Sequence, residues 1–213
     1  MKKALALVIL IVAPSIIFAQ GTIAVANGAD SLVMERVPFL FVSVPAGGGM
    51  VQFLAAADGT PVKPLGTFRP DSDGGASFIT TYNTLASYLA ANPGWNACSA
   101  VGIAPITGRF NAGVVTVSPL VAGGNIEYVV IGWTGSSASL DDAIASGSAA
   151  IGESALYTGI ATGNPTTTPP ATPSLMSSSF LGLALAPVVV PEPSAFELAG
   201  LGAVMLAVLR RRG

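Results

Sequence analysis

Short apolar runs, separated by turn residues, fill the middle of the chain. Runs of this length that are rich in Val, Ile, Phe and Tyr predict β-strands, and many of them at close spacing predict an all-β sandwich. The alternation of apolar and polar positions is clear at Val115 and Val117, and again at Ile126, Tyr128 and Val130. The expected strands span residues 21–26, 38–44, 50–56, 76–80, 114–118, 126–134, 155–161 and 180–186.

Three segments interrupt this pattern. Residues 84–91 and 139–145 each predict a short helix, and the second carries Asp141 and Asp142 in its first turn, where carboxylates suit the helix dipole. Residues 163–173 are rich in Pro and Thr, which predicts a loop before a last strand, with a stalk carrying O-linked sugars as the alternative. We therefore expect a β-sandwich domain over residues 20–162, and a loop with a last strand over residues 163–187.

The first 19 residues have the pattern of a secretory signal peptide. Lys2 and Lys3 precede an uncharged apolar stretch over residues 4–13, and Ala19 and Gln20 mark the expected cut. About ten apolar residues are too few to span a bilayer core of about 30 Å, which favours removal over anchoring. The expected partners are the Sec export machinery and signal peptidase.

The last 26 residues, 188–213, combine three elements. The extended peptide Pro191-Glu192-Pro193 comes first, then an apolar helix over about residues 195–209, and the cluster Arg210, Arg211 and Arg212 follows. Two prolines hold the peptide extended, because each fixes φ near −65° and lacks an N–H group. The 15-residue helix is about 22 Å long, so it predicts a short membrane span, and the arginines keep its end in the cytoplasm.

This tail resembles the PEP-CTERM sorting signal of bacteria that make exopolysaccharide. The resemblance implies that Pro191, Glu192 and Pro193 are recognised by an exosortase, a membrane-embedded cysteine transpeptidase that cuts near them, and that the three arginines stop transfer. Glu197 is an unusual charge within such a helix. In the middle of the chain, Trp133 and the segments 140–143, 152–154 and 157–159 are similar to a recurrent PEP-CTERM protein type with no established activity.

The composition excludes several classes of function. The chain has 213 residues, no histidine, a single cysteine (Cys98), 9% charged residues and a net charge of −2. A histidine-based catalytic pair, an intramolecular disulfide and a nucleic-acid partner are therefore excluded.

Few residues suggest chemistry in the ectodomain. Ser154 follows Gly152 as in a hydrolase elbow, but Leu156 replaces the final glycine, so we expect no catalysis there. Asp71 and Asp73 resemble the start of a calcium loop, but the glutamate that completes such a loop is missing, so a polar turn is the favoured interpretation. A sugar-stacking surface would draw on Trp95, Trp133, Tyr82, Tyr88, Tyr128 and Tyr157, and a glycosidase-like pair on Asp58, Asp71, Asp73, Glu127, Asp141, Asp142 and Glu153.

These observations predict an exported protein without a cofactor and without enzymatic activity. It would lie in the inner membrane in transit and end at the cell surface or in the extracellular matrix, in a structural or adhesive role. Two alternatives remain open. The ectodomain is a carbohydrate-binding module of the exopolysaccharide matrix, or the tail is a permanent membrane anchor.

Overall fold

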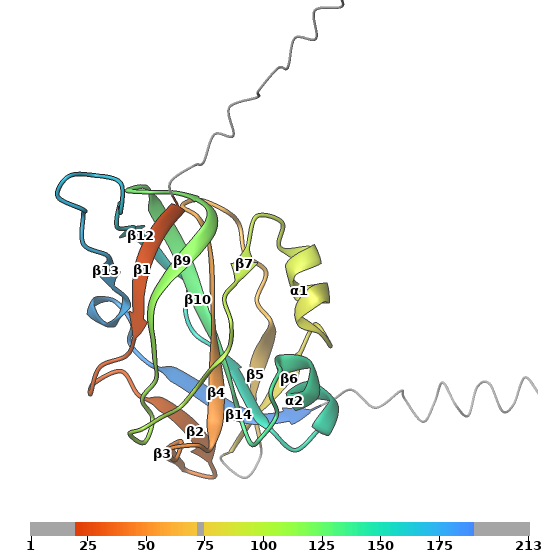
Figure 1. Ribbon diagram of the computed structural model, residues 1–213. Coiled ribbons are helices and arrows are strands. Elements are labelled where there is room, and N and C mark those ends of the chain that lie inside the picture. Colours follow the sequence, from red (N-terminus) through yellow and green to blue (C-terminus); the bar gives the residue numbers. More distant parts are fainter. Residues whose placement is uncertain (1–19, 72–74, 190–213) are drawn as a thin grey trace, which may run out of the picture.

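A computed structural model describes residues 20–71 and 75–189 of the chain. The fold is mostly β, as expected, and its larger sheet is curled like half of a barrel. Figure 1 shows α1 and α2 on the side of the molecule opposite β1 and β13.

The strands form two sheets. The small sheet has the order β13-β1-β9, and the large sheet has the order β3-β2-β14-β11-β10-β4-β7, with β12 beside β10, β8 beside β4, and the β5–β6 hairpin joined to β14 through β6. The strands of the small sheet are β1 (Gln20–Ala26), β9 (Asn111–Val121) and β13 (Ser174–Leu175). Those of the large sheet are β2 (Val33–Val37), β3 (Leu40–Ser43), β4 (Gly49–Ala57), β5 (Gly66–Pro70), β6 (Ala76–Thr80), β7 (Asn96–Ala97), β8 (Val101–Gly102), β10 (Asn125–Thr134), β11 (Ala150–Glu153), β12 (Tyr157–Ala161) and β14 (Leu183–Val189).

The central pair, β4 and β10, separates two hydrophobic cores. The two strands run antiparallel, from Ile126 opposite Ala57 to Thr134 opposite Gly49. Because successive side chains of a strand point to opposite faces, β10 contributes Ile126, Tyr128 and Val130 to one core and Val129, Ile131 and Trp133 to the other. The first core lies between the two sheets and the second lies beneath α1, α2 and β6. Burial on both faces explains why β10 is apolar at nearly every position.

Both expected helices form, and local signals fix their ends. α1 (Leu85–Ala91) begins after Thr84, whose side chain accepts a hydrogen bond from the Ser87 N–H while the Ser87 hydroxyl accepts one from the Thr84 N–H. α2 (Leu140–Ser146) begins after Ser139, whose side chain accepts from the Asp142 N–H, and ends at Gly147 in the left-handed conformation. A short 3₁₀ helix, η1 (Met176–Ser178), precedes the last strand.

Several expected strands have different bounds. The run expected over residues 38–44 is a hairpin turn at Pro38 and Phe39 followed by β3, and its partner β2 was not predicted. The last strand begins at Leu183 and continues through Val188 and Val189, which pair with β6, so both residues belong to the body and not to the tail. The Pro/Thr-rich segment is a loop between β12 and β13.

Candidate functional site

The residues of the expected sorting signals precede and follow the described chain in the sequence. Gln20 is the exposed first residue of β1. β14 ends at Val189, which is 45% exposed and lies two positions before Pro191 in the sequence. Ala19, Pro191, Glu192, Pro193, Arg210, Arg211, Arg212 and the helix expected over residues 195–209 lie outside the described residues. In the described parts of the chain, no helix is long and apolar enough to cross a bilayer.

Glu153, on β11, connects three elements through its carboxylate. The Tyr88 hydroxyl of α1 donates to Oε1 at 2.7 Å, and the Leu65 N–H donates to Oε2 at 2.7 Å. Burial raises the pKa of Glu153, while the two hydrogen bonds act in the opposite direction. Burial also raises the pKa of Tyr88, and the charge of Glu153 adds to that effect. Tyr88 therefore remains a protonated donor. Through these two hydrogen bonds, the Glu153 carboxylate links β11 to α1 and to the segment before β5.

Glu127, on β10, is only 2% exposed. Its Oε2 accepts from the Gly59 N–H at 3.3 Å, and its Oε1 is buried without a hydrogen-bond partner among the described residues. Burial raises the pKa of Glu127, the Gly59 N–H lowers it, and the charge of neighbouring Asp58 raises it. Asp58 in turn accepts from the Gly159 N–H at 3.0 Å. The two carboxyl groups thus hold the turn after β4 against β10 and β12.

The remaining described carboxyl groups of the suggested glycosidase pair also serve local structure. Asp141 accepts from the Leu85 N–H at 2.6 Å, so the first turn of α2 supports the first turn of α1. Asp142 accepts from the Ser139 hydroxyl at 2.7 Å. Asp71 accepts from the Ser77 hydroxyl at 3.1 Å, and Asp73, its expected partner in a calcium loop, lies outside the described residues. Within residues 20–71 and 75–189, no three His, Cys, Asp or Glu side chains are grouped to hold a metal ion.

The Ser154 hydroxyl accepts one hydrogen bond from the backbone and donates another to it. Its Oγ accepts from the Val130 N–H at 2.9 Å and donates to the Ala155 carbonyl oxygen at 2.9 Å. The Ser154 N–H donates to the Val130 carbonyl oxygen at 2.9 Å. The hydroxyl therefore joins β10 to the segment between β11 and β12.

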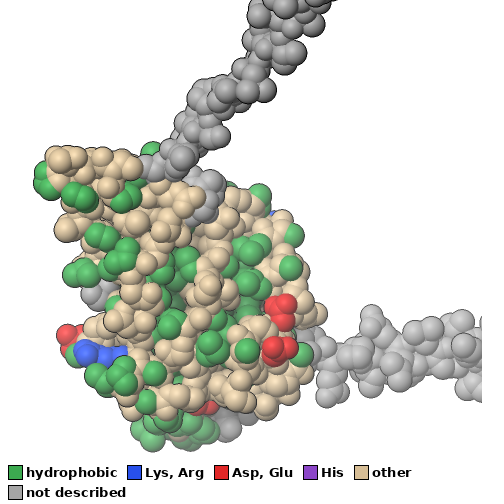
Figure 2. All heavy atoms as spheres, in the orientation of Figure 1, with side chains coloured by type: hydrophobic (Ala, Val, Ile, Leu, Met, Phe, Trp, Pro, Cys, Tyr) green, Lys and Arg blue, Asp and Glu red, His purple; other side chains and the backbone are tan. Residues whose placement is uncertain are grey.

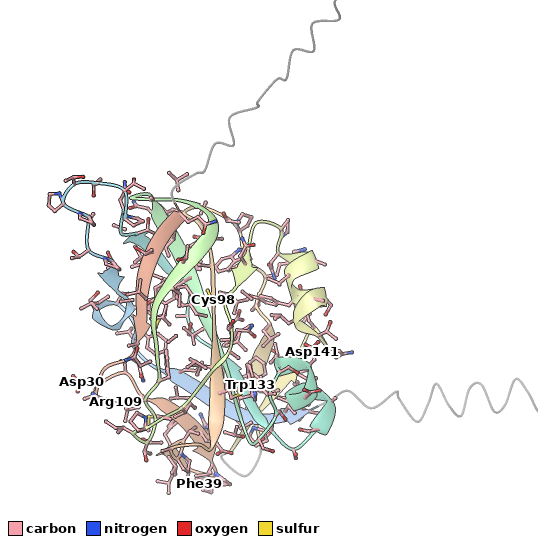
Figure 3. All side chains as sticks on the ribbon, in the orientation of Figure 1. Asp30, Phe39, Cys98, Arg109, Trp133 and Asp141 are labelled. Atoms are coloured by element: carbon pink, nitrogen blue, oxygen red, sulfur yellow. The ribbon has the colours of Figure 1, made fainter. Side chains whose placement is uncertain are left out.

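The aromatic residues suggested for sugar stacking are mostly in the cores. Trp95, Trp133, Tyr88 and Tyr128 are at most 4% exposed, and Figure 3 places Trp133 inside the fold. The Trp133 Nε1–H donates to the Ser137 carbonyl oxygen at 2.9 Å, which satisfies the one polar atom of its ring. Tyr82 and Tyr157 are half-buried. Four of the six rings are therefore closed to a ligand in this conformation.

Cys98 lies beside a groove between the edges of the two sheets. Residues 96–101 line one side of this groove and residues 112 and 115–117 of β9 line the other, around a volume of about 700 Å³. Burial raises the pKa of the half-buried Cys98 thiol, so it is protonated at neutral pH. Most of the side chains lining the groove are small and uncharged.

One exposed apolar feature of the described residues was missed from the sequence. The hairpin of β2 and β3 carries Phe39, Leu40, Phe41 and Val42, which are 79%, 64%, 50% and 49% exposed. The sequence predicted one strand over residues 38–44. The available signals were the Pro-Phe pair, which starts a turn, and four consecutive apolar residues without alternation.

Comparison with known proteins identified no relative of this chain. The chain matches no protein-family model, no curated protein and no solved structure.

Proposed function

We propose that this chain is an exported bacterial protein that a C-terminal sorting signal delivers to the cell surface or the exopolysaccharide matrix. The observation that carries the proposal is the tail, in which Pro191-Glu192-Pro193, an apolar run and three arginines follow in order. The Sec machinery exports the chain and signal peptidase removes residues 1–19. An exosortase-like enzyme then acts near Pro191 while the apolar run lies in the inner membrane.

The described body is compatible with this order of events. β1 (from Gln20) and β14 (to Val189) contain the first and last described residues, and the expected leader and recognition sequence lie outside the described residues. A cut at either place would leave every described strand intact. An extended peptide next to the exit of a folded body is accessible to an enzyme at the membrane surface.

We propose a structural or adhesive role for the body, as a substrate of sorting and not as a catalyst. It would act as one β-sandwich, an arrangement supported by the core between the small and the large sheet. Hydrogen bonds that occupy Glu153, Asp58, Asp141 and Ser154 with backbone groups favour a structural use of these side chains.

The test is fractionation of the native host carrying the natural chain or a variant with Pro191, Glu192 and Pro193 changed to alanine. We expect the natural protein at the surface or in the medium and the variant retained in the inner membrane at a higher mass. The control is Pro170→Ala with Thr172→Ala, two exposed positions in the loop after β12. Equal release of all three proteins would refute the sorting proposal, and retention of the uncut natural protein would favour the permanent anchor.

A further inference from the structure

The β2–β3 hairpin exposes apolar side chains on both of its faces. In an antiparallel pair, opposite residues share a face, so Phe41 lies on the face of Arg36, and Leu40 lies with Val37 on the other face. Leu40 and Phe41 are both at least half exposed. A strand that only covered a core would bury one face, so this hairpin extends beyond the core beneath it.

The hairpin turn holds an aromatic ring outward at a conformational cost. Val37 pairs with Leu40, which leaves Pro38 and Phe39 as the two turn residues, and Phe39 has φ of 64°. A positive φ at this position suits glycine or asparagine and is unfavourable for a bulky side chain. Figure 3 shows Phe39 at the lower tip of the molecule, away from both cores. The unfavourable backbone conformation therefore accompanies a Phe39 ring that is exposed to solvent and does not pack in either core.

The apolar surface continues next to the hairpin. Leu32, Met34, Phe41 and Leu181 line an adjoining groove of about 410 Å³, and Leu181 is 83% exposed. Figure 2 shows hydrophobic side chains gathered at this lower end of the molecule. The guanidinium of Arg36 lies 5.4 Å from the centre of the Phe41 ring. Glu35 is next to Arg36 in β2, and Asp30 lines the groove, so the surface at the base of the hairpin carries both signs of charge, while residues 38–42 of the tip carry none.

The length of chain after β14 indicates what this surface meets. β2 and β14 run parallel, with Val33 opposite Leu183 and Glu35 opposite Leu185. The end of β2 that leads into the hairpin turn therefore points in the same direction as the end of β14 at Val189. Only five residues separate Val189 from Ala195, where the expected membrane helix begins. Even a fully extended chain spans only about 20 Å over that stretch. A body whose tail is inserted is therefore confined to the membrane surface.

We propose that the β2–β3 hairpin, with Phe39, Leu40 and Phe41 at its centre, docks the body onto the lipid surface of the membrane while the tail is inserted. The proposal rests on the proposed function, since the inserted tail provides the confinement. A lipid interface surrounds a protruding tip, and so covers both faces of the hairpin. A second copy paired along the β3 edge would leave those faces exposed. The Arg36 guanidinium would lie at the depth of the lipid phosphates.

The test measures whether position 40 contacts lipid in the full chain. Leu40→Cys in a Cys98→Ala background is labelled with an environment-sensitive dye, and the chain is reconstituted in phosphatidylglycerol–phosphatidylethanolamine vesicles with or without brominated acyl chains. The matched control is a label at Val121, which is 68% exposed and pairs with Gln20 at the end of the molecule opposite the hairpin (Figure 1). Because interfacial elements lie about 5–10 Å deep in the bilayer, we expect brominated lipid to reduce fluorescence about twofold at position 40 and leave position 121 unchanged.

A second variant adds Phe39→Asp and Phe41→Asp to the labelled chain, which we expect to abolish the quenching without unfolding the body, since both rings are at the surface. Protease protection of the tail is measured in the same vesicles. Quenching that is absent while the tail is inserted overturns the docking proposal and leaves the sorting proposal standing. A tail that is not inserted counts against the sorting proposal. In that case, the quenching of the label at position 40 by brominated lipid still decides whether the hairpin contacts the membrane. Shielding of position 40 by a second copy, seen as label-to-label energy transfer without bromine quenching, also overturns docking.

Discussion

Single buried polar side chains hold the long connections of this molecule in place. The Asn27 side chain donates to the Ser31 and Gly108 carbonyl oxygens at 2.7 and 2.9 Å and accepts from the Phe110 N–H at 2.8 Å. The Asn92 side chain accepts from the Lys63 N–H at 2.6 Å. An unpartnered buried polar group costs about 1–3 kcal/mol, so such side chains stabilise the fold only when their partners are in place.

Glu153 makes the stability of the body depend on pH. Burial raises the pKa of its carboxyl group in the folded chain above the usual value of 4.5. When the pKa of a carboxyl group is higher in the folded than in the unfolded chain, the protonated group favours folding. This contribution to stability is complete at pH values below the pKa of the unfolded chain, and it is lost as the pH rises through the pKa of the folded chain. We therefore expect the free energy of unfolding of the natural chain to fall as the pH rises from about 4 toward neutrality, and to fall less in Glu153→Gln.

The measurement is urea unfolding of the purified chain at a series of pH values. Asp30→Asn serves as the control, because Asp30 is exposed at the surface. An unchanged pH dependence in Glu153→Gln, or an equal change in the control, would show that burial of Glu153 does not cause the effect.

At the scale of the elements, local signals were readable and long-range pairing was not. Thr84 and Ser139 are N-caps next to apolar runs, so both helices were predicted within one residue at each end. β2 was missed because Glu35 and Arg36 break the apolar pattern, and its place depends on β14, about 150 residues later in the chain. β11 was missed because Gly152 and Glu153 resemble a turn when read alone. Only pairing with β10 and β14 makes the segment a strand.

Gly152 shows how closely β11 and β14 approach each other. A Cβ atom at this position would overlap the carbonyl oxygen of Ala184 in β14, which is backbone and cannot rotate away. We expect Gly152→Ala to lower the unfolding free energy by about 1–3 kcal/mol, the usual cost of overpacking. Gly102→Ala, where the new Cβ would meet no atom within 4 Å, should change it by at most about 0.5 kcal/mol. Equal unfolding midpoints for the two variants would contradict this packing.

At the scale of the whole molecule, two hydrophobic cores take up much of the apolar content of the described body. Hydrophobic residues make up 51% of the chain, and much of this fraction in the body lies on both faces of one curled sheet. The sequence predicted the mostly β class and suggested the sorting residues from linear order alone. The exposed hairpin was not predicted. The Pro-Phe pair and the apolar run do not set a register by themselves, and the register that turns residues 38 and 39 into a tip depends on pairing with β2.

The central claim is that the mature protein has lost both ends of its chain. Intact-mass spectrometry of the protein recovered from the surface or medium of the native host tests this claim most directly. The account predicts a chain that begins at Gln20 and ends near Pro191, without the apolar run and the arginines that follow. Recovery of the protein from the cytoplasm as an uncut chain of 213 residues would contradict it.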